Sequence, residues 1–87
     1  MAFHCLLTSP AGMRFDGDVW QVTVPSTDGL FSIRTGHVPV IAMIKNGILE
    51  IARSENDRIR FTVTSGVAEH TTTNGCRIVC ESAEPVA

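Results

Sequence analysis

The stretch RIRFTVT, residues 58–64, alternates polar and apolar side chains from its first residue to its last. Its apolar members are Ile59, Phe61 and Val63, and arginine or threonine stands between them. Because successive side chains of a β-strand point to opposite faces, this pattern predicts a strand with one face in a core and the other in solvent. Arg58 and Arg60 are therefore interpreted as part of the solvent face.

Two segments elsewhere in the chain show the same alternation and predict further strands. In DVWQVTV, residues 18–24, it predicts one face made of Trp20, Val22 and Val24 and an opposite face made of Val19, Gln21 and Thr23. In CRIVC, residues 76–80, it predicts one face made of Cys76, Ile78 and Cys80.

Turn-forming residues separate these runs along the whole chain. Asn46-Gly47 and Asn74-Gly75 are the strongest hairpin signals, because Asn-Gly readily adopts positive φ. Short strands between such turns, with no helical period, are typical of an antiparallel sandwich or barrel. We therefore predict one all-β domain over residues 1–87, a single antiparallel β-sandwich or flattened barrel of about nine or ten short strands.

The composition narrows the classes of function. A net charge of −2, with 44% hydrophobic and 18% charged residues, is typical of a globular domain and argues against disorder. Nucleic-acid binding is not expected, because phosphate recognition needs clustered Lys and Arg. No run reaches the ~20 apolar residues that cross a bilayer, and the N-terminus lacks the basic start of a signal peptide. We expect no direct membrane insertion, so that any membrane contact depends on a partner.

The cysteines are expected to be buried and reduced. The chain has three of them, an odd number that cannot all pair internally. Four residues of strand separate Cys76 from Cys80 by roughly 13 Å. A disulfide requires Cα atoms within about 7 Å, so this pair cannot bridge while the strand is intact.

The histidines do not indicate a metal site. His4, His37 and His70 are far apart in the sequence and share no ligand spacing. One minor alternative stays open, a composite site formed by His4, Cys5 and a cysteine from another strand. We predict no metal and no cofactor.

The other candidate chemical sites are incomplete. Asp16 and Asp18 in FDGDV lack the remaining ligands of a calcium loop and are interpreted as turn residues. Ser65, His70 and Asp57 could in principle assemble as a triad, but no motif distinguishes them from ordinary turn residues. No glycine-rich phosphate loop occurs. The sequence does not predict an enzyme.

The segment STDGLFSIRTGHVPVIAMIKNGILEI, residues 26–51, resembles the N-terminal domain of the epsilon subunit of bacterial F-type ATP synthase, called delta in mitochondria. That family has an acidic-Gly turn, a short apolar strand, Gly-His-x-Pro and an apolar strand that ends in Lys-x-Gly. The corresponding elements here are Asp28-Gly29, residues 30–33, residues 36–40 and residues 45–47. FDGDVWQVTVPSTDG and FTVTSGVAEHTTTNGCRIVCESA are similar to its opening and closing strands, so that the match extends roughly from Phe3 to Ala83.

The resemblance implies a non-catalytic rotor subunit of the central stalk, which links gamma to the c ring and supports the coupling of ion transport to ATP synthesis. It further implies a peripheral position on the cytoplasmic face of the bacterial inner membrane. The expected contacts at a c-ring edge are Asp28, Leu30, Phe31, Gly36, His37 and Pro39, and those on the gamma side are Met43 and Ile44. Leu30 departs from the acidic residue that many members have there, which favours an apolar contact.

A second departure concerns the C-terminal end. Members of the family usually continue into a pair of helices, which in many bacteria inhibits ATP hydrolysis and in some binds ATP. This sequence stops at Ala87, so we expect no ATP binding by these residues. A naturally short subunit and a truncated one both stay open.

Alternatives stay open for the role of His37 and for the class of the protein. The first interpretation of His37 is a loop residue that hydrogen-bonds backbone groups or a partner's polar loop. The second is a residue that only stabilises its own turn. The competing class is a free-standing β-sandwich that binds a small ligand or a peptide. Co-purification with gamma and c subunits would separate the two classes.

Overall fold

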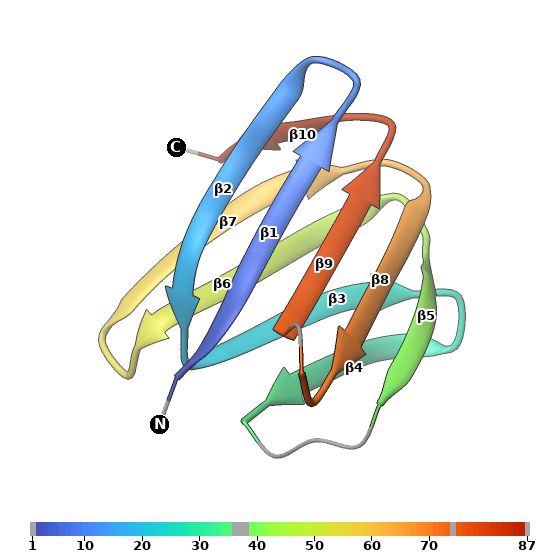
Figure 1. Cartoon of the computed structure of the whole chain (residues 1–87). Coiled ribbons are helices and arrows are strands. Elements are labelled where there is room, and N and C mark those ends of the chain that lie inside the picture. The colour runs from blue at the N-terminus through green and yellow to red at the C-terminus, as the bar shows by residue number, and fades with distance from the viewer. Residues whose placement is uncertain (1, 36–38, 74, 87) are drawn as a thin grey trace.

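The computed structural model describes residues 2–35, 39–73 and 75–86. Its described residues form ten strands and no helix, which confirms the predicted all-β sandwich (Figure 1). The strands are β1 (Phe3–Ser9), β2 (Gly12–Val19), β3 (Gln21–Ser26), β4 (Gly29–Arg34), β5 (Val40–Ile44), β6 (Gly47–Ser54), β7 (Asp57–Val63), β8 (Gly66–Thr71), β9 (Gly75–Cys80) and β10 (Ala83–Pro85).

The strands form two layers that face each other (Figure 1). The front layer has the order β5-β8-β9-β1-β2, and the back layer has the order β4-β3-β6-β7-β10. A single residue pair, Ser26 with Ile44, joins β3 to β5 and thereby connects the layers along one side. On the other side, β2 packs against β6. Among the described pairings only β1 with β9 is parallel, and the others are antiparallel.

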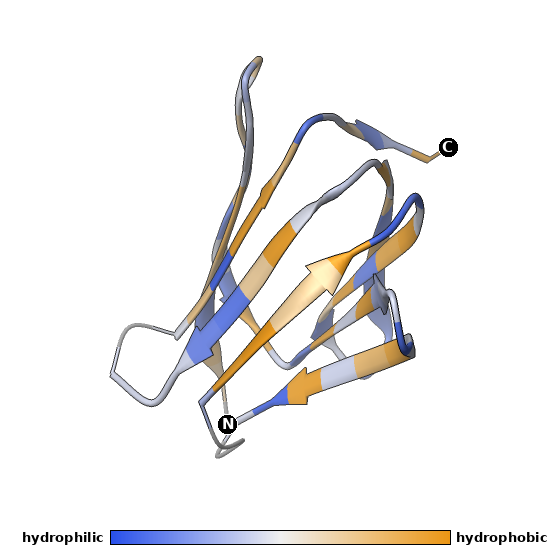
Figure 2. Cartoon of the chain, turned by 90° about the vertical axis from the view of Figure 1, so that its right-hand side faces the viewer, coloured by the Kyte–Doolittle hydropathy of each residue, from blue (hydrophilic) through white to orange (hydrophobic). Residues whose placement is uncertain are grey.

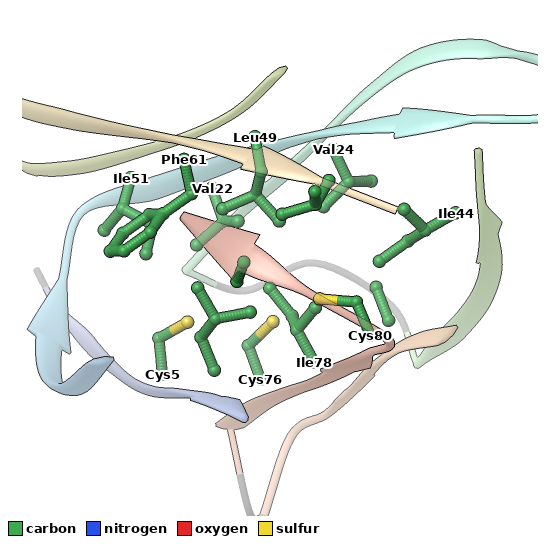
Figure 3. Packing of buried hydrophobic residues seen from close by; sticks show 14 of the residues in the cluster. Cys5, Val22, Val24, Ile44, Leu49, Ile51, Phe61, Cys76, Ile78 and Cys80 are labelled. Carbon is green, nitrogen blue, oxygen red and sulfur yellow. The ribbon is translucent and has the colours of Figure 1, made fainter. Parts of the chain in front are cut away.

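The core lies between the layers and takes apolar side chains from the inner face of each. Figure 2 shows the alternation of hydrophobic and hydrophilic residues along the strands, and Figure 3 shows the buried side chains meeting in the middle. The largest fully buried side chains include Leu7 and Ile78 from the front layer and Leu49 and Ile51 from the back layer. In the RIRFTVT segment, Phe61 and Val63 are buried and the arginines are exposed, as predicted.

The alternation predicted for DVWQVTV is wrong at Trp20. Val19 is completely buried, as are Val22 and Val24, whereas Trp20 is 36% exposed. The chain bends at Trp20, because β2 ends at Val19 and β3 begins at Gln21 in the other layer. The bend shifts the phase of the alternation, so residues 18–24 are parts of two strands.

The Asn46-Gly47 hairpin prediction is also wrong. β5 and β6 belong to different layers and pair with other strands. Asn46 accepts a hydrogen bond from the backbone N–H of Ser65 (3.1 Å), and a Cβ on Gly47 would lie 2.9 Å from Cβ of Pro25. Glycine therefore permits close packing at this crossover. The second signal is confirmed, since β8 and β9 form a hairpin in which Gly75 has a φ of 76°; Asn74 lies outside the described residues.

Candidate functional site

The turn between β3 and β4 leads into the most exposed of the large apolar side chains described, that of Leu30 at the start of β4. Ser26 organises this turn, because its hydroxyl donates to the carbonyl of Gly29 (2.6 Å) and accepts from the backbone N–H of Asp28 (3.2 Å). Gly29 has a φ of 114°, which a residue with a side chain rarely adopts. The turn leaves Leu30 78% exposed. Phe31 points the other way, half-buried against the core.

This turn is fastened to the C-terminal end of β5. The backbone N–H of Thr27 donates to the carbonyl of Met43 (3.1 Å), and that of Lys45 donates to the carbonyl of Pro25 (2.8 Å). Asp28 and Leu30 therefore lie near the end of β5 that contains Met43. The predicted c-ring contacts of the turn are thus neighbours of the predicted gamma contacts.

Pro39 lies at the other end of β4 and β5. It is exposed and directly precedes β5, in agreement with the expectation that it begins a strand. From Gly29 to Arg34, β4 extends over about 16 Å. The structure therefore does not bring Asp28, Leu30 and Pro39 together at one edge. Gly36 and His37 lie outside the described residues, so their predicted contacts stay predictions.

Alternation along β5 separates the two residues predicted on the gamma side. Met43 is 58% exposed on the outer face of the front layer. Ile44 is 3% exposed and points into the core, in the same cluster as Leu49 and Cys80 (Figure 3). The side chain available to a partner at this position is Met43.

Met43 belongs to an apolar patch that crosses three strands. In register, Met43 stands opposite Val67 of β8, and Val67 opposite Val79 of β9, while Ile41 lies two residues before Met43 on β5. These four side chains are 39% to 67% exposed. We call Ile41, Met43, Val67 and Val79 the apolar outer face. The exposed pair Glu69 and Arg77 continues the row of Ile41 and so lies beside the row of Met43, Val67 and Val79.

Open hollows extend the apolar outer face at both ends. One is lined by Val67 and Val79 together with the end of β1 and Pro10 after it. The other is lined by Pro39, Ile41 and His70, among others. Pro39 thus continues the apolar outer face. Sequence analysis missed Val67 and Val79, although the alternation of CRIVC already placed Val79 opposite the core-facing residues.

The outer face of the back layer contains a cluster of arginines. Glu50 of β6 accepts from Arg58 (3.1 Å) and from Arg60 (3.0 Å) of β7. Arg60, followed by Arg58, lowers the pKa of the Glu50 carboxyl below its ordinary value of 4.5. Trp20 lies between Arg34 and Arg58, whose guanidinium carbons are 5.8 and 6.0 Å from its ring centroid. We call Trp20, Arg34, Glu50, Arg58 and Arg60 the arginine face.

The thiols and imidazoles do not form a metal centre within residues 2–35, 39–73 and 75–86, where no cluster of three ligands occurs. His4 faces outward and hydrogen-bonds Asp16, whereas Cys5 faces the core. The two side chains therefore point to opposite faces of β1 and cannot bind one metal ion together, as the composite site would require. The structure does pair Cys5 with Cys76 across β1 and β9. The hydrogen bond between these thiols, together with burial, raises the pKa of Cys5, which keeps it protonated and unreactive.

The three cysteines are free and buried, as predicted, and point into the core together (Figure 3). Burial raises the pKa of the Cys80 thiol as well. The described part of the chain includes no helix long and apolar enough to cross a bilayer.

A comparison with protein families identifies this architecture. The model of the ATP synthase delta/epsilon chain β-sandwich domain matches residues 2–86. The chain belongs to this family. The ATP synthase epsilon chain of Rhodopseudomonas palustris (strain TIE-1) is 37% identical over 83 residues, which are 95% of this chain and 60% of the relative. This chain therefore spans less than two thirds of the length of that relative.

Two solved structures have the same fold. A chain of the Euglena gracilis mitochondrial ATP synthase, solved by cryo-EM as OSCP/F1/c-ring in rotational state 1, matches with a TM-score of 0.89 at 20% identity. That match covers 97% of this chain and 53% of the other. A chain of the Tetrahymena thermophila mitochondrial ATP synthase central stalk and c-ring matches with a TM-score of 0.76 at 19% identity, over 92% of this chain and 63% of the other. The resemblance drawn from the sequence is confirmed.

Proposed function

We propose that this chain is a non-catalytic central-stalk subunit of an F-type ATP synthase. In this role it links the gamma subunit to the c ring and supports the coupling of ion transport to ATP synthesis. It would be a peripheral part of the complex at the cytoplasmic face of the bacterial inner membrane. Family membership supports the assignment, and the observation that carries it is the apolar outer face.

The apolar outer face is the proposed gamma contact. Its four side chains are contiguous across β5, β8 and β9, and a charged pair borders them. Permanent interfaces are more apolar at their centre than the rest of a protein surface and have a polar rim. Pro39 belongs to the same contact, because it lines a hollow with Ile41.

The β3–β4 turn is the proposed c-ring contact. Leu30 protrudes there, and Asp28 is exposed beside it. Hydrogen bonds from Ser26 and from the end of β5 hold the turn in place. Because the turn is held by both layers, a lateral force on it is transmitted to the whole sandwich. A subunit that rotates together with gamma and the c ring requires this stiffness.

Binding to purified gamma subunit tests the assignment. Met43→Glu places a charge at the centre of the apolar outer face, and we expect it to weaken gamma binding about a hundredfold, as loss of a central anchor does. Ile48→Glu is the matched control, because Ile48 is an exposed apolar residue on the outer face of the other layer. Isothermal titration calorimetry measures both affinities, and circular dichroism melting checks that both variants fold.

Two results would overturn the proposal. If the unsubstituted chain does not bind gamma at micromolar concentrations, the rotor assignment is wrong. If Met43→Glu and Ile48→Glu weaken binding equally, gamma does not use the apolar outer face.

A further inference from the structure

Trp20 is the centre of the arginine face. It stands at the bend between the layers, where its backbone N–H donates to the carbonyl of Ala52 (2.7 Å). Arg34 reaches its ring from β4, and Arg58 reaches it from β7. Each guanidinium carbon is within 6.0 Å of the ring centroid, which is the distance of a cation–π contact.

The register of the back layer shows how the ring lies. Gln21 of β3 pairs with Arg34 on one side and with Ala52 of β6 on the other, and Ala52 pairs with Arg58. The two arginines are thus three strand spacings apart, about 14 Å between their backbones. Ala52 is 1% exposed although it alternates with the core residue Ile51, so a neighbouring side chain covers it. We assign this cover to the Trp20 ring, because both guanidinium groups reach that ring and the backbone N–H of Trp20 binds the carbonyl of Ala52.

The positive charge of this surface is only partly compensated. Arg58 and Arg60 share a single carboxylate, that of Glu50. Arg34 donates to the neutral side-chain oxygen of Gln21 (2.7 Å). The arginine face therefore has three guanidinium groups and one carboxylate, and that carboxylate pairs with Arg58 and Arg60. The local charge of this face is opposite in sign to the net charge of −2 of the whole chain.

We propose that the arginine face docks an acidic segment of a partner protein, with an apolar side chain on Trp20 and carboxylates on Arg34 and Arg58. The guanidinium fork matches a carboxylate in two parallel hydrogen bonds. Tryptophan and arginine are the residue types that contribute most to binding energy at protein interfaces. Arg58 already donates one Nη to Glu50, so a partner's carboxylate at Arg58 would accept from its other guanidinium nitrogens.

An anionic membrane fits this surface less well. Glu50 lies at the same surface as the arginines and neutralises part of their charge. Binding to a lipid surface increases with the number of uncompensated basic residues, and stable anchoring needs several. The inference concerns the layer opposite to the apolar outer face and does not depend on which partner that face binds.

A synthetic peptide tests the proposal on the full 87-residue chain. The probe is a helical peptide with glutamates seven positions apart, about 10 Å along the helix, and a leucine between them on the same face. The chain has one tryptophan, so fluorescence emission reports contact at Trp20 directly. We expect a saturable change of emission, with binding that weakens as salt is raised from 50 to 500 mM.

Substitutions at the arginines make the test specific. Arg34→Gln or Arg58→Gln should each weaken peptide binding about tenfold, the usual effect of losing one charge-assisted hydrogen bond. Arg77→Gln removes an exposed arginine from the front layer and should leave the affinity unchanged. A control peptide with glutamine in place of glutamate should bind at least tenfold more weakly. Thermal melting checks that each variant folds.

Three outcomes would overturn the proposal. The glutamine peptide could bind as tightly as the glutamate peptide, or Arg77→Gln could weaken binding as much as Arg34→Gln. Vesicles of phosphatidylcholine with 30% phosphatidylserine could shift the Trp20 emission while the peptide has no effect, which would assign the surface to lipid.

Discussion

The two layers have similar inner faces and different outer faces. Inside, both contribute valine, leucine and isoleucine to one core. Outside, the front layer presents Met43, Val67 and Val79, whereas the back layer presents Trp20 among arginines. Burial against the opposite layer fixes the inner residues, whereas the contacts described for the outer ones are surface ion pairs and cation–π contacts that contribute little to the fold. The inner pattern therefore determines the fold, and the outer pattern is free to specify a partner for each layer.

The largest effect on stability is expected for an isoleucine-to-alanine substitution on the inner face of the front layer, compared with the same substitution on its outer face. Ile78→Ala removes a fully buried side chain and should lower the free energy of unfolding by about 2–5 kcal/mol. Ile41→Ala makes the same chemical change at a side chain that is 67% exposed, and should alter it by less than about 0.5 kcal/mol. Urea unfolding at neutral pH measures both. Equal losses would mean that the apolar outer face contributes to folding, and the contrast between the faces would then disappear.

The next largest effect concerns the glycine that lets β8 approach β9. A Cβ at Gly66 would lie 2.0 Å from the carbonyl oxygen of Val79 and 2.7 Å from Cα of Cys80. Gly66→Ala should therefore force β8 away from β9, which destabilises the domain by about 2 kcal/mol or more and disrupts the row that joins Val67 to Val79.

Gly17→Ala is the control for this substitution. The nearest atom to a Cβ at Gly17 belongs to the Phe15 ring at 3.5 Å, an ordinary contact, so the change in stability should stay below about 1 kcal/mol. If Gly66→Ala proved as stable as Gly17→Ala, the close approach of β8 and β9 would not be what aligns the apolar outer face.

Much of the fold could be predicted because strand alternation is a local signal. Residues 58–64 and 76–80 lie within single strands, and the burial of Phe61, Val63 and Ile78 agrees with the prediction from neighbouring residues alone. Trp20 could not be predicted in this way. The bend that exposes it depends on which layer the chain joins next, and that depends on pairing between residues distant in the sequence.

The candidate site was less predictable for the same reason. Asp28, Leu30 and Pro39 are near one another in the sequence, yet β4 separates the turn from Pro39. The apolar outer face requires Met43 to lie opposite Val67 and Val67 opposite Val79, and this register is a property of the sheet. Ile44 and Met43 look equivalent in an apolar run, and only the position of the second layer decides which of them is buried.

The smallest predicted effect concerns the charge of the back layer. Arg60 first, and then Arg58, hold the pKa of Glu50 below its ordinary value of 4.5. A carboxyl whose pKa is lowered by folding stabilises the folded state above its unfolded-state pKa, and this stabilisation is lost as the pH falls through the folded-state value. Glu50→Gln should therefore cost less than about 1 kcal/mol at pH 7, because the ion pairs are at the surface, and progressively less below pH 4.5.

The two arginines can be compared directly by following the Glu50 carboxyl carbon in an NMR titration. Arg60→Gln should raise the pKa of Glu50 more than Arg58→Gln does, since Arg60 is the stronger cause of the shift. This order would mean that Glu50 pairs mainly with Arg60, so that a partner's carboxylate at Arg58 competes less with Glu50. The reverse order would mean that Glu50 pairs mainly with Arg58. The apolar outer face would then be a stronger candidate for partner binding than the arginine face.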